Sequence, residues 1–117
     1  MSFTLAHRDD CETTGNWRLV RRTLGLRAFG LNVVEIPPGD QIPEHDETDR
    51  DQEEVFYVLS GSPTLIIDGE DHAVRAGTFA RLDPVHSRTV RNDGQEPASV
   101  LIASAPRSSG YEPLAWA

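Results

Sequence analysis

The sequence predicts an all-β domain, folded as a sandwich or a barrel. Short runs rich in β-branched and aromatic residues recur along the chain, and turn-forming stretches such as Asp68-Gly69 and Asn92-Asp93-Gly94 separate them. No run has the apolar period of about 3.6 residues that a convincing amphipathic helix would need. Short strands at regular spacing, with turns between them, are typical of antiparallel β-sandwiches and β-barrels.

The turn chemistry sets the expected order of elements. Residues 1–15 are polar and lack a sustained period, so they are expected to form a loose leader or an edge element. A tail over residues 106–117 is expected to dock onto the body through Tyr111, Leu114 and Trp116. Between these ends, the predicted strands cover residues 17–24, 29–36, 55–59, 64–67, 72–74, 78–82, 87–91 and 98–103.

Length and charge restrict the possible functions. The 117 residues are enough for one domain with its own core, so a single domain over residues 1–117 is expected. With 19 acidic and 11 basic residues the formal charge is −8, which argues against nucleic acid and anionic membranes as partners. Neither an apolar run of about 18 residues nor a signal-peptide pattern is seen, so the expected location is the cytoplasm. Cys11 is the only cysteine, which excludes an internal disulfide.

The segment from Gly39 to Gly61, GDQIPEHDETDRDQEEVFYVLSG, carries the main candidate site. Residues 55–59 read as a strand that is buried on both faces. The period of two places Glu54, Phe56 and Val58 on one side of that strand. His45 and Glu47 lie two residues apart, so an extended backbone would direct both side chains toward the same side. The pattern therefore predicts a carboxylate and an imidazole at the wall or mouth of a barrel.

These residues resemble the cupin superfamily, whose small members are double-stranded β-helix (jelly-roll) barrels. In the first cupin motif, Gly39 and His45 match with DQIPE between them, and Glu54 and Gly61 match with VFYVLS between them. The second motif begins at Gly77 and ends at Asn92. The resemblance covers about residues 30–103 and implies one cupin barrel, flanked by the leader and the tail. It is specific for the fold and far less specific for function.

The chain departs from the family pattern at two metal-ligand positions. Glu47 stands at the second histidine of the first motif, and Arg88 stands at the histidine of the second motif. The family's ligand set would therefore map onto His45, Glu47, Glu54 and Arg88, of which only His45 and Glu54 are retained. Arginine has no lone pair to offer a metal, and its guanidinium suits a carboxylate. We expect Arg88 to pair with Glu54 or Glu47 in place of a metal, so that no cofactor is needed.

A metal site remains the alternative, because His86 shares the strand parity of Arg88 and could point inward. His45, Glu47, Glu54 and His86 would then form a set of ligands for one divalent transition metal, namely Zn, Mn, Fe or Ni. His86 follows Pro84-Val85 in a predicted bend, where the direction of its side chain is open, as is that of Arg81.

Two functions follow from these alternatives, and the sequence leaves open whether the chain is an enzyme. In the first, the barrel binds a small polar or anionic organic molecule, without redox chemistry of its own, in a sensor, carrier or accessory role. The ligand-binding residues would be His45, Glu47, Glu54, Phe56, Val58, His86 and Arg88, with Arg88 anchoring an anionic oxygen. In the second, the chain is a metal-dependent cupin enzyme of the dioxygenase or sugar isomerase/epimerase type, with His45, Glu54 and some of Glu47 and His86 as ligands.

Two further expectations concern the surface. The resemblance implies a homodimer, and an exposed edge strand over residues 17–24 would favour pairing through sheet edges. The arginines at the start of the chain are interpreted as balancing the acidic surface; they are Arg18, Arg21, Arg22 and Arg27.

Overall fold

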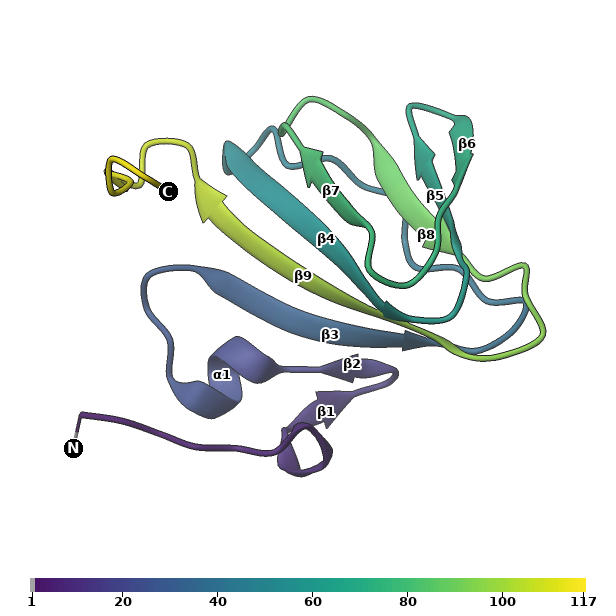
Figure 1. The fold of residues 1–117 in the computed structure, drawn as a ribbon, viewed down its shortest axis with the longest axis horizontal. Coiled ribbons are helices and arrows are strands. Elements are labelled where there is room, and N and C mark those ends of the chain that lie inside the picture. The colour runs from purple at the N-terminus through teal and green to yellow at the C-terminus, as the bar shows by residue number, and fades with distance from the viewer. Residues whose placement is uncertain (1) are drawn as a thin grey trace.

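The computed structural model describes residues 2–117 and contains two antiparallel sheets around one core (Figure 1). The larger sheet has six strands in the order β1-β2-β3-β9-β4-β7, and the smaller has three in the order β6-β5-β8. This architecture confirms the predicted all-β jelly roll. The strands are β1 (Thr13–Thr14), β2 (Trp17–Arg18), β3 (Gly30–Ile36), β4 (Gln52–Ser60), β5 (Thr64–Ile67), β6 (Glu70–Ala73), β7 (Phe79–Leu82), β8 (Arg88–Arg91) and β9 (Ala98–Pro106), and the helices are η1, a 3-10 helix (Arg8–Asp10), and α1 (Val20–Leu24).

The core lies between the two sheets because both contribute apolar side chains to it. Val34, Phe56 and Val100 come from the large sheet, and Leu65 and Val90 come from the small one; all five are buried. Burial of such side chains is worth about 1.5–3 kcal/mol each and supplies the main driving force for closing the sheets on each other.

Strand β4 has the predicted facing. Glu54, Phe56 and Val58 are buried, while the residues between them are more exposed. The neighbouring strand β9 pairs with β4 so that Glu54 lies opposite Ser104 and Phe56 lies opposite Ile102. Directly opposed residues share a face of the sheet, so Ser104 stands beside Glu54 at the polar end of this inner row.

The segment before β4 closes the barrel by pairing with β8. Isolated bridges join Gln41 to Arg91 and His45 to Arg88. Around the second bridge, the His45 amide donates to the Arg88 carbonyl at 3.1 Å and the Arg88 amide donates to the His45 carbonyl at 2.8 Å. This pairing brings two residues that are 43 positions apart in the sequence onto adjacent strands.

The predicted strand over residues 17–24 is wrong beyond its first two residues. Only Trp17–Arg18 is extended, and Val20–Leu24 forms α1. Alternation between apolar and polar residues stops at Val20, and Gly25 ends the helix in the left-handed conformation, with φ of 74°. Because β2 is paired with β1 on one side and with β3 on the other, it offers no free edge.

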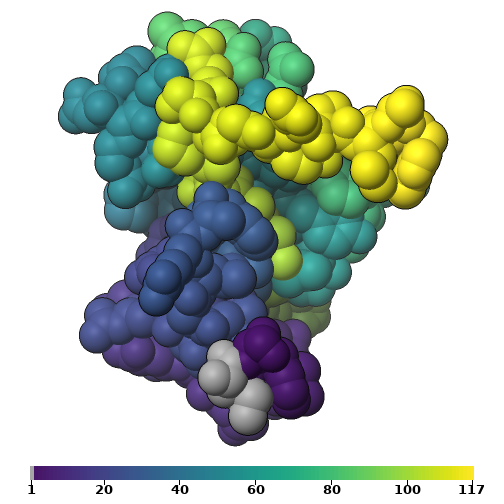
Figure 2. Space-filling model, turned by 90° about the vertical axis from the view of Figure 1, so that its left-hand side faces the viewer, coloured from purple at the N-terminus to yellow at the C-terminus, as the bar shows by residue number. Residues whose placement is uncertain are grey.

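The two ends of the chain differ in how they meet the barrel. The leader ends in β1, which forms the edge of the large sheet, in line with the expected edge element. The tail is different: Tyr111, Leu114 and Trp116 are 78%, 63% and 84% exposed, so the prediction that they dock onto the body is wrong for this chain. Figure 2 shows the tail in yellow, projecting from the body. Within the described residues, no helix is long and apolar enough to cross a membrane.

Candidate functional site

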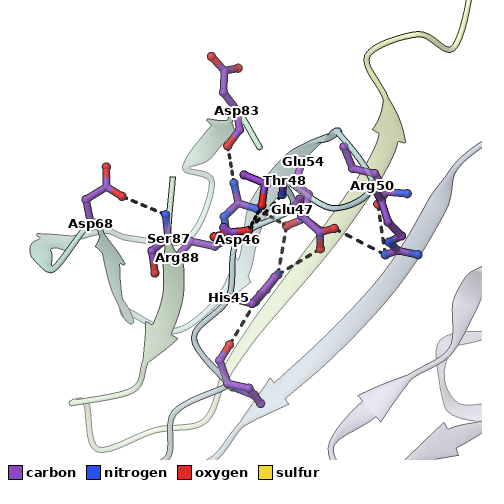
Figure 3. Close-up of polar contacts among 12 residues, drawn as sticks. His45, Asp46, Glu47, Thr48, Arg50, Glu54, Asp68, Asp83, Ser87 and Arg88 are labelled. Atoms are coloured by element: carbon purple, nitrogen blue, oxygen red, sulfur yellow. Dashed lines mark hydrogen bonds and ion pairs between the residues drawn. The ribbon is translucent and has the colours of Figure 1, made fainter. Parts of the chain in front are cut away.

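Four of the predicted site residues meet at the polar end of the barrel (Figure 3). The His45 Nε2 atom lies 3.4 Å from Glu47 Oε1 and 3.5 Å from Glu54 Oε1. Arg88 Nη1 lies 3.1 Å from the same Glu54 oxygen. We call His45, Glu47, Glu54 and Arg88 the polar cluster. Their convergence follows from the parity of β4 and from the bridge between His45 and Arg88.

The Arg88 side chain is fully buried, and the protein itself binds its guanidinium. Its relative exposure is 0%. Nη1 donates to Glu54 Oε1, and Nη2 donates to the Asp83 carbonyl at 2.6 Å, while Nε has no hydrogen-bond partner within residues 2–117. A buried guanidinium requires a counter-charge, and Glu54 supplies it. Arg88 therefore fixes the position of Glu54, and its terminal nitrogens are already occupied by protein oxygens.

The protonation of Glu54 reflects competing effects. Burial raises the pKa of its carboxyl above the ordinary value, and the nearby negative charge of Glu47 raises it further. The positive charge of Arg88 and the hydrogen bond with His45 act in the opposite direction without cancelling the rise. Two carboxylates in one partly dry site therefore favour a hydrogen-bond donor that approaches them.

Asp83 and Arg50 belong to this site, although the sequence did not single them out. Asp83 contributes only its backbone carbonyl, and a backbone contact leaves no mark in the sequence. The Arg50 Nη2 atom lies 3.7 Å from Glu47 Oε2 on the outer side of the polar cluster. Its spacing of three residues from Glu47 was the one available signal in the sequence.

His86 does not join the polar cluster, contrary to the expected alternative. Its Nδ1 atom lies 2.7 Å from Asp68 Oδ2 on the surface, and the side chain is 44% exposed. The hydrogen bond from His86, followed by one from the Ser87 amide, lowers the pKa of the Asp68 carboxyl. Strand β8 begins at Arg88, so the period of two does not extend back to His86 in the preceding bend. Arg81 also points outward, and its Nε atom lies 3.6 Å from Asp83 Oδ1.

Phe56 and Val58 are core residues and not the walls of an open ligand cavity. The space that they border, together with seven other residues of both sheets and their loops, amounts to about 10 Å³. A cavity of that size holds at most about one water molecule. Any organic ligand must therefore lie outside this packed end, at the mouth of the barrel.

A larger cleft opens beside the polar cluster. Its volume is about 620 Å³, and polar side chains from three strands line it, among them Asn32 of β3, Gln52 of β4 and Ser104 of β9. Ser104 lies opposite Glu54 in the sheet, and Arg50 lines the cleft while contacting Glu47. Cleft and cluster are therefore neighbours at one end of the barrel. We call this space the mouth cleft.

The donor set fits a metal ion only in part. His45, Glu47 and Glu54 each offer a ligand atom, and these atoms lie within 4.8 Å of one another. The fourth position is held by Arg88, whose permanent positive charge lies 3.1 Å from a prospective ligand oxygen of Glu54. A divalent cation there would be repelled by the buried guanidinium, because arginine does not lose its proton. The residues therefore do not fit the four-ligand metal centre that the resemblance implies.

Comparisons with known proteins agree with this fold. A family model described as a cupin domain matches residues 32–104. A cupin protein from Bacteroides fragilis matches with a TM-score of 0.82 and 20% identity over 99% of this chain and 93% of its own. A comparison with curated proteins finds no match.

Two further solved structures carry activities in their names. One is a sugar phosphate isomerase of the cupin superfamily from Silicibacter pomeroyi, with a TM-score of 0.67 and 22% identity over 76% of this chain and 57% of that one. The other is a predicted oxalate decarboxylase from Thermotoga maritima, with a TM-score of 0.61 and 22% identity over 66% and 65% of the two chains. At these identities the likeness establishes the fold alone. From the family model and the shared architecture together, the chain belongs to the cupin family.

Proposed function

We propose that this cupin binds a small polar or anionic organic molecule at the barrel mouth, without redox chemistry of its own, in a sensor, carrier or accessory role. The observation that carries the proposal is the buried guanidinium of Arg88, bonded to Glu54 where relatives of the family would hold a ligand histidine. The positive charge at this point is permanent and supplied by the chain, which removes the need for a metal ion to neutralise Glu54.

The polar cluster gives each residue a distinct part in binding. His45 is 36% exposed at its side chain and presents Nε2 beside both carboxylates. The Glu47 side chain is more buried and has one oxygen 3.4 Å from His45 Nε2, while Arg88 orients Glu54 through the contact of its Nη1 atom. Carboxylates and an imidazole in this arrangement suit the hydroxyl or amine groups of a ligand. Phe56 and Val58 support the floor by packing, and Arg88 positions Glu54 in place of the direct anchoring that the sequence suggested.

Titration with small molecules followed by amide NMR tests this proposal. We expect saturable shifts at residues 45–54 with at least one of four probes: D-glucose, D-gluconate, succinate and D-glucose 6-phosphate. His45→Ala should weaken that binding by about tenfold or more, because it removes a direct contact at the mouth. His72→Ala is the matched control, since His72 lies exposed on β6, and it should leave the affinity unchanged. Absence of saturable shifts with all four probes would contradict the proposal.

A second candidate is a metal-dependent cupin enzyme of the dioxygenase or sugar isomerase/epimerase type. The observation in its favour is the set of ligand atoms of His45, Glu47 and Glu54, all within 4.8 Å of one another. The activities in the names of the structural neighbours point in the same direction. Thermal unfolding with Mn²⁺, Fe²⁺, Ni²⁺ and Zn²⁺ separates the two candidates, because a metal that binds the native state must raise the melting temperature. A saturable rise that His45→Ala abolishes favours the enzyme, and a flat response favours the first proposal.

A further inference from the structure

The mouth cleft has a charge opposite to that of the whole protein. Its charged lining residues are Arg21 of α1, Arg27 of the loop that follows it, and Arg50 of the segment before β4. Among the described residues that line it, none has an acidic side chain, although the chain carries 19 Asp and Glu and a formal charge of −8. Three guanidinium groups around one concave space form a local site for an anion within an otherwise acidic molecule.

The fold brings these arginines together from distant parts of the chain. The Arg21 Nη1 atom donates to the Leu26 carbonyl at 3.2 Å, which ties the helix to the loop that carries Arg27. Arg50 approaches from the opposite side of the cleft, after the acidic loop. In Figure 2, the blue segment that leads into β3, the teal segment before β4 and the yellow-green end of β9 lie on the face turned toward the viewer. The expectation that Arg21 and Arg27 only balance the acidic surface overlooked this grouping, which needs α1 in place of a strand.

Gly30 allows the floor of the cleft to be polar. A Cβ atom at this position would lie 2.5 Å from Ser104 Oγ, so glycine lets that hydroxyl keep its position, whereas a larger residue would make it rotate away. The hydroxyl of Ser104, which lies opposite Glu54 in the sheet, and the amides of Asn32 and Gln52 line the cleft together with the arginines. These uncharged groups hydrogen-bond hydroxyls well and distinguish little between donors and acceptors.

The mouth therefore combines cationic and neutral polar groups, which line the cleft, with the carboxylates of the neighbouring polar cluster. Guanidinium groups bind phosphate or carboxylate oxygens, while the Glu47 carboxylate accepts hydrogen bonds from hydroxyl groups. The cleft and the polar cluster meet at Arg50, whose Nη2 atom lies 3.7 Å from Glu47 Oε2. A volume of about 620 Å³ is in the range of sites for small organic ligands.

From this arrangement, we propose that the ligand of the mouth is a small polyhydroxylated anion, with its phosphate or carboxylate among Arg21, Arg27 and Arg50 and its hydroxyl groups directed to the polar cluster. This inference rests on the proposed function and narrows it to one class of molecule. The apolar end of the barrel takes no part, because Phe56 and its neighbours fill it.

Calorimetry with four probes tests both the charge and the hydroxyl groups of the ligand. The probes are D-glucose 6-phosphate, D-gluconate, D-glucose and inorganic phosphate, at low salt. We expect one of the two hydroxylated anions to bind at least about tenfold more tightly than D-glucose and than inorganic phosphate, because each of the latter offers only half of the contacts. The ranking of D-glucose 6-phosphate against D-gluconate identifies the anionic group.

Variants locate the anion. Arg21→Gln/Arg27→Gln removes two cleft charges and spares Arg50, which contacts Glu47. It should weaken the tighter anion by about tenfold or more and leave D-glucose unchanged. The matched control is Arg8→Gln/Arg75→Gln, which removes the same charge from exposed sites outside the cleft. An equal loss in the control, or no loss in the cleft variant, overturns the inference.

The outcomes separate this inference from the proposed function. D-Glucose bound as tightly as the anions, with shifts at residues 45–54, would end the inference and leave the proposed function standing. Inorganic phosphate bound as tightly as D-glucose 6-phosphate would overturn the role of the hydroxyl groups. Anion binding that depends on the cleft arginines but not on His45 would contradict the part of the polar cluster in the proposed function, and with it the placement of the hydroxyl groups in this inference. No binding of any probe would end both.

Discussion

At the scale of single residues, the pair of Glu54 and Arg88 determines the character of the site. Both side chains are buried, and their closest atoms are 3.1 Å apart. Taking two charges out of water costs several kcal/mol for each ion, and the attraction between them repays that cost only when their remaining atoms are bonded. Here Arg88 Nη2 donates to the Asp83 carbonyl, and Glu54 lies beside His45 Nε2. The Nε atom of Arg88 has no hydrogen-bond partner within residues 2–117. The ion pair of Glu54 and Arg88 therefore fixes the position of the Glu54 carboxylate at the mouth and contributes little net stability to the fold.

A double-mutant cycle measures how far the contributions of Arg88 and Glu54 to stability depend on each other. Arg88→Met and Glu54→Gln should each lower the free energy of unfolding by about 3–5 kcal/mol, because each leaves the other charge buried without its partner. The double variant Arg88→Met/Glu54→Gln should lose less than the sum of the two by about 1 kcal/mol or more. Urea denaturation gives all three values. Strict additivity would show that the two side chains do not depend on each other.

The pH dependence of Arg88→Met follows from the raised pKa of Glu54. A carboxyl whose folded pKa lies above its ordinary value of 4.5 contributes stability at low pH that is lost as pH rises through the folded pKa. The charge of Arg88 lowers the pKa of Glu54, so the Arg88→Met substitution raises that pKa further. The variant therefore loses more stability as the pH rises. The stability gap between wild type and Arg88→Met should therefore widen from about pH 5 to about pH 7.5. Glu54→Gln and its double variant lack this carboxyl and should differ by an amount that hardly changes over the same range.

At the scale of elements, strand β4 carries the site and its ends fix the geometry. The strand ends at Ser60, and Gly61 turns the chain toward the small sheet with φ of 83°. A Cβ atom at Gly61 would lie 2.8 Å from the Ala98 Cα and 2.9 Å from the Pro97 carbonyl oxygen. The turn therefore needs glycine for its backbone conformation and for its close approach to β9.

Two alanine substitutions separate these reasons. Gly77 also has a positive φ, of 94°, but a Cβ there would have no neighbour within 4 Å. Gly77→Ala should lower the free energy of unfolding by about 1–2 kcal/mol through backbone strain alone. Gly61→Ala should cost about 1–3 kcal/mol more, because the methyl group also displaces β9. Chemical denaturation of both variants provides the comparison, and equal costs would show that the contact with Ala98 yields without strain.

The site was predictable where it depends on strand periodicity. The period of two in β4 correctly placed Glu54, Phe56 and Val58 on the inner face, and the spacing of His45 and Glu47 correctly placed both at the same end. The direction of the His86 side chain was left open by the sequence, and it lies at the surface because β8 begins only at Arg88. The mouth cleft could not be foreseen, since residues 20–24 have too short a pattern to show a helix. That Arg21 and Arg50 line one cleft is a result of the tertiary fold.

At the scale of the whole molecule, the sheets form a closed body from which the tail extends. Turn chemistry and alternation predicted most of the strands along the chain, because a hairpin depends on local residues such as Asp68-Gly69. The position of the tail depends on long-range contacts that residue type does not encode: Leu114 and Trp116 look like anchors but are exposed. The homodimer stays a prediction without the free edge that was expected at residues 17–24, and light scattering would test it.

The two tryptophans provide a direct check of the tail. Trp17 packs against the core from β2, whereas Trp116 is 84% exposed. Trp17→Ala should lower the free energy of unfolding by about 2–4 kcal/mol, and Trp116→Ala should change it by less than about 0.5 kcal/mol. Thermal unfolding of the two variants at matched concentration compares them. A large loss in Trp116→Ala would mean that the tail is packed in solution, against this chain or a second copy.

Elemental analysis of protein purified without chelator tests most directly whether a guanidinium has replaced the metal at the polar cluster. With Arg88 buried against Glu54, we expect Mn, Fe, Ni and Zn each to fall well below one equivalent per chain. Close to one equivalent of a single transition metal, lost on His45→Ala substitution, would contradict this account.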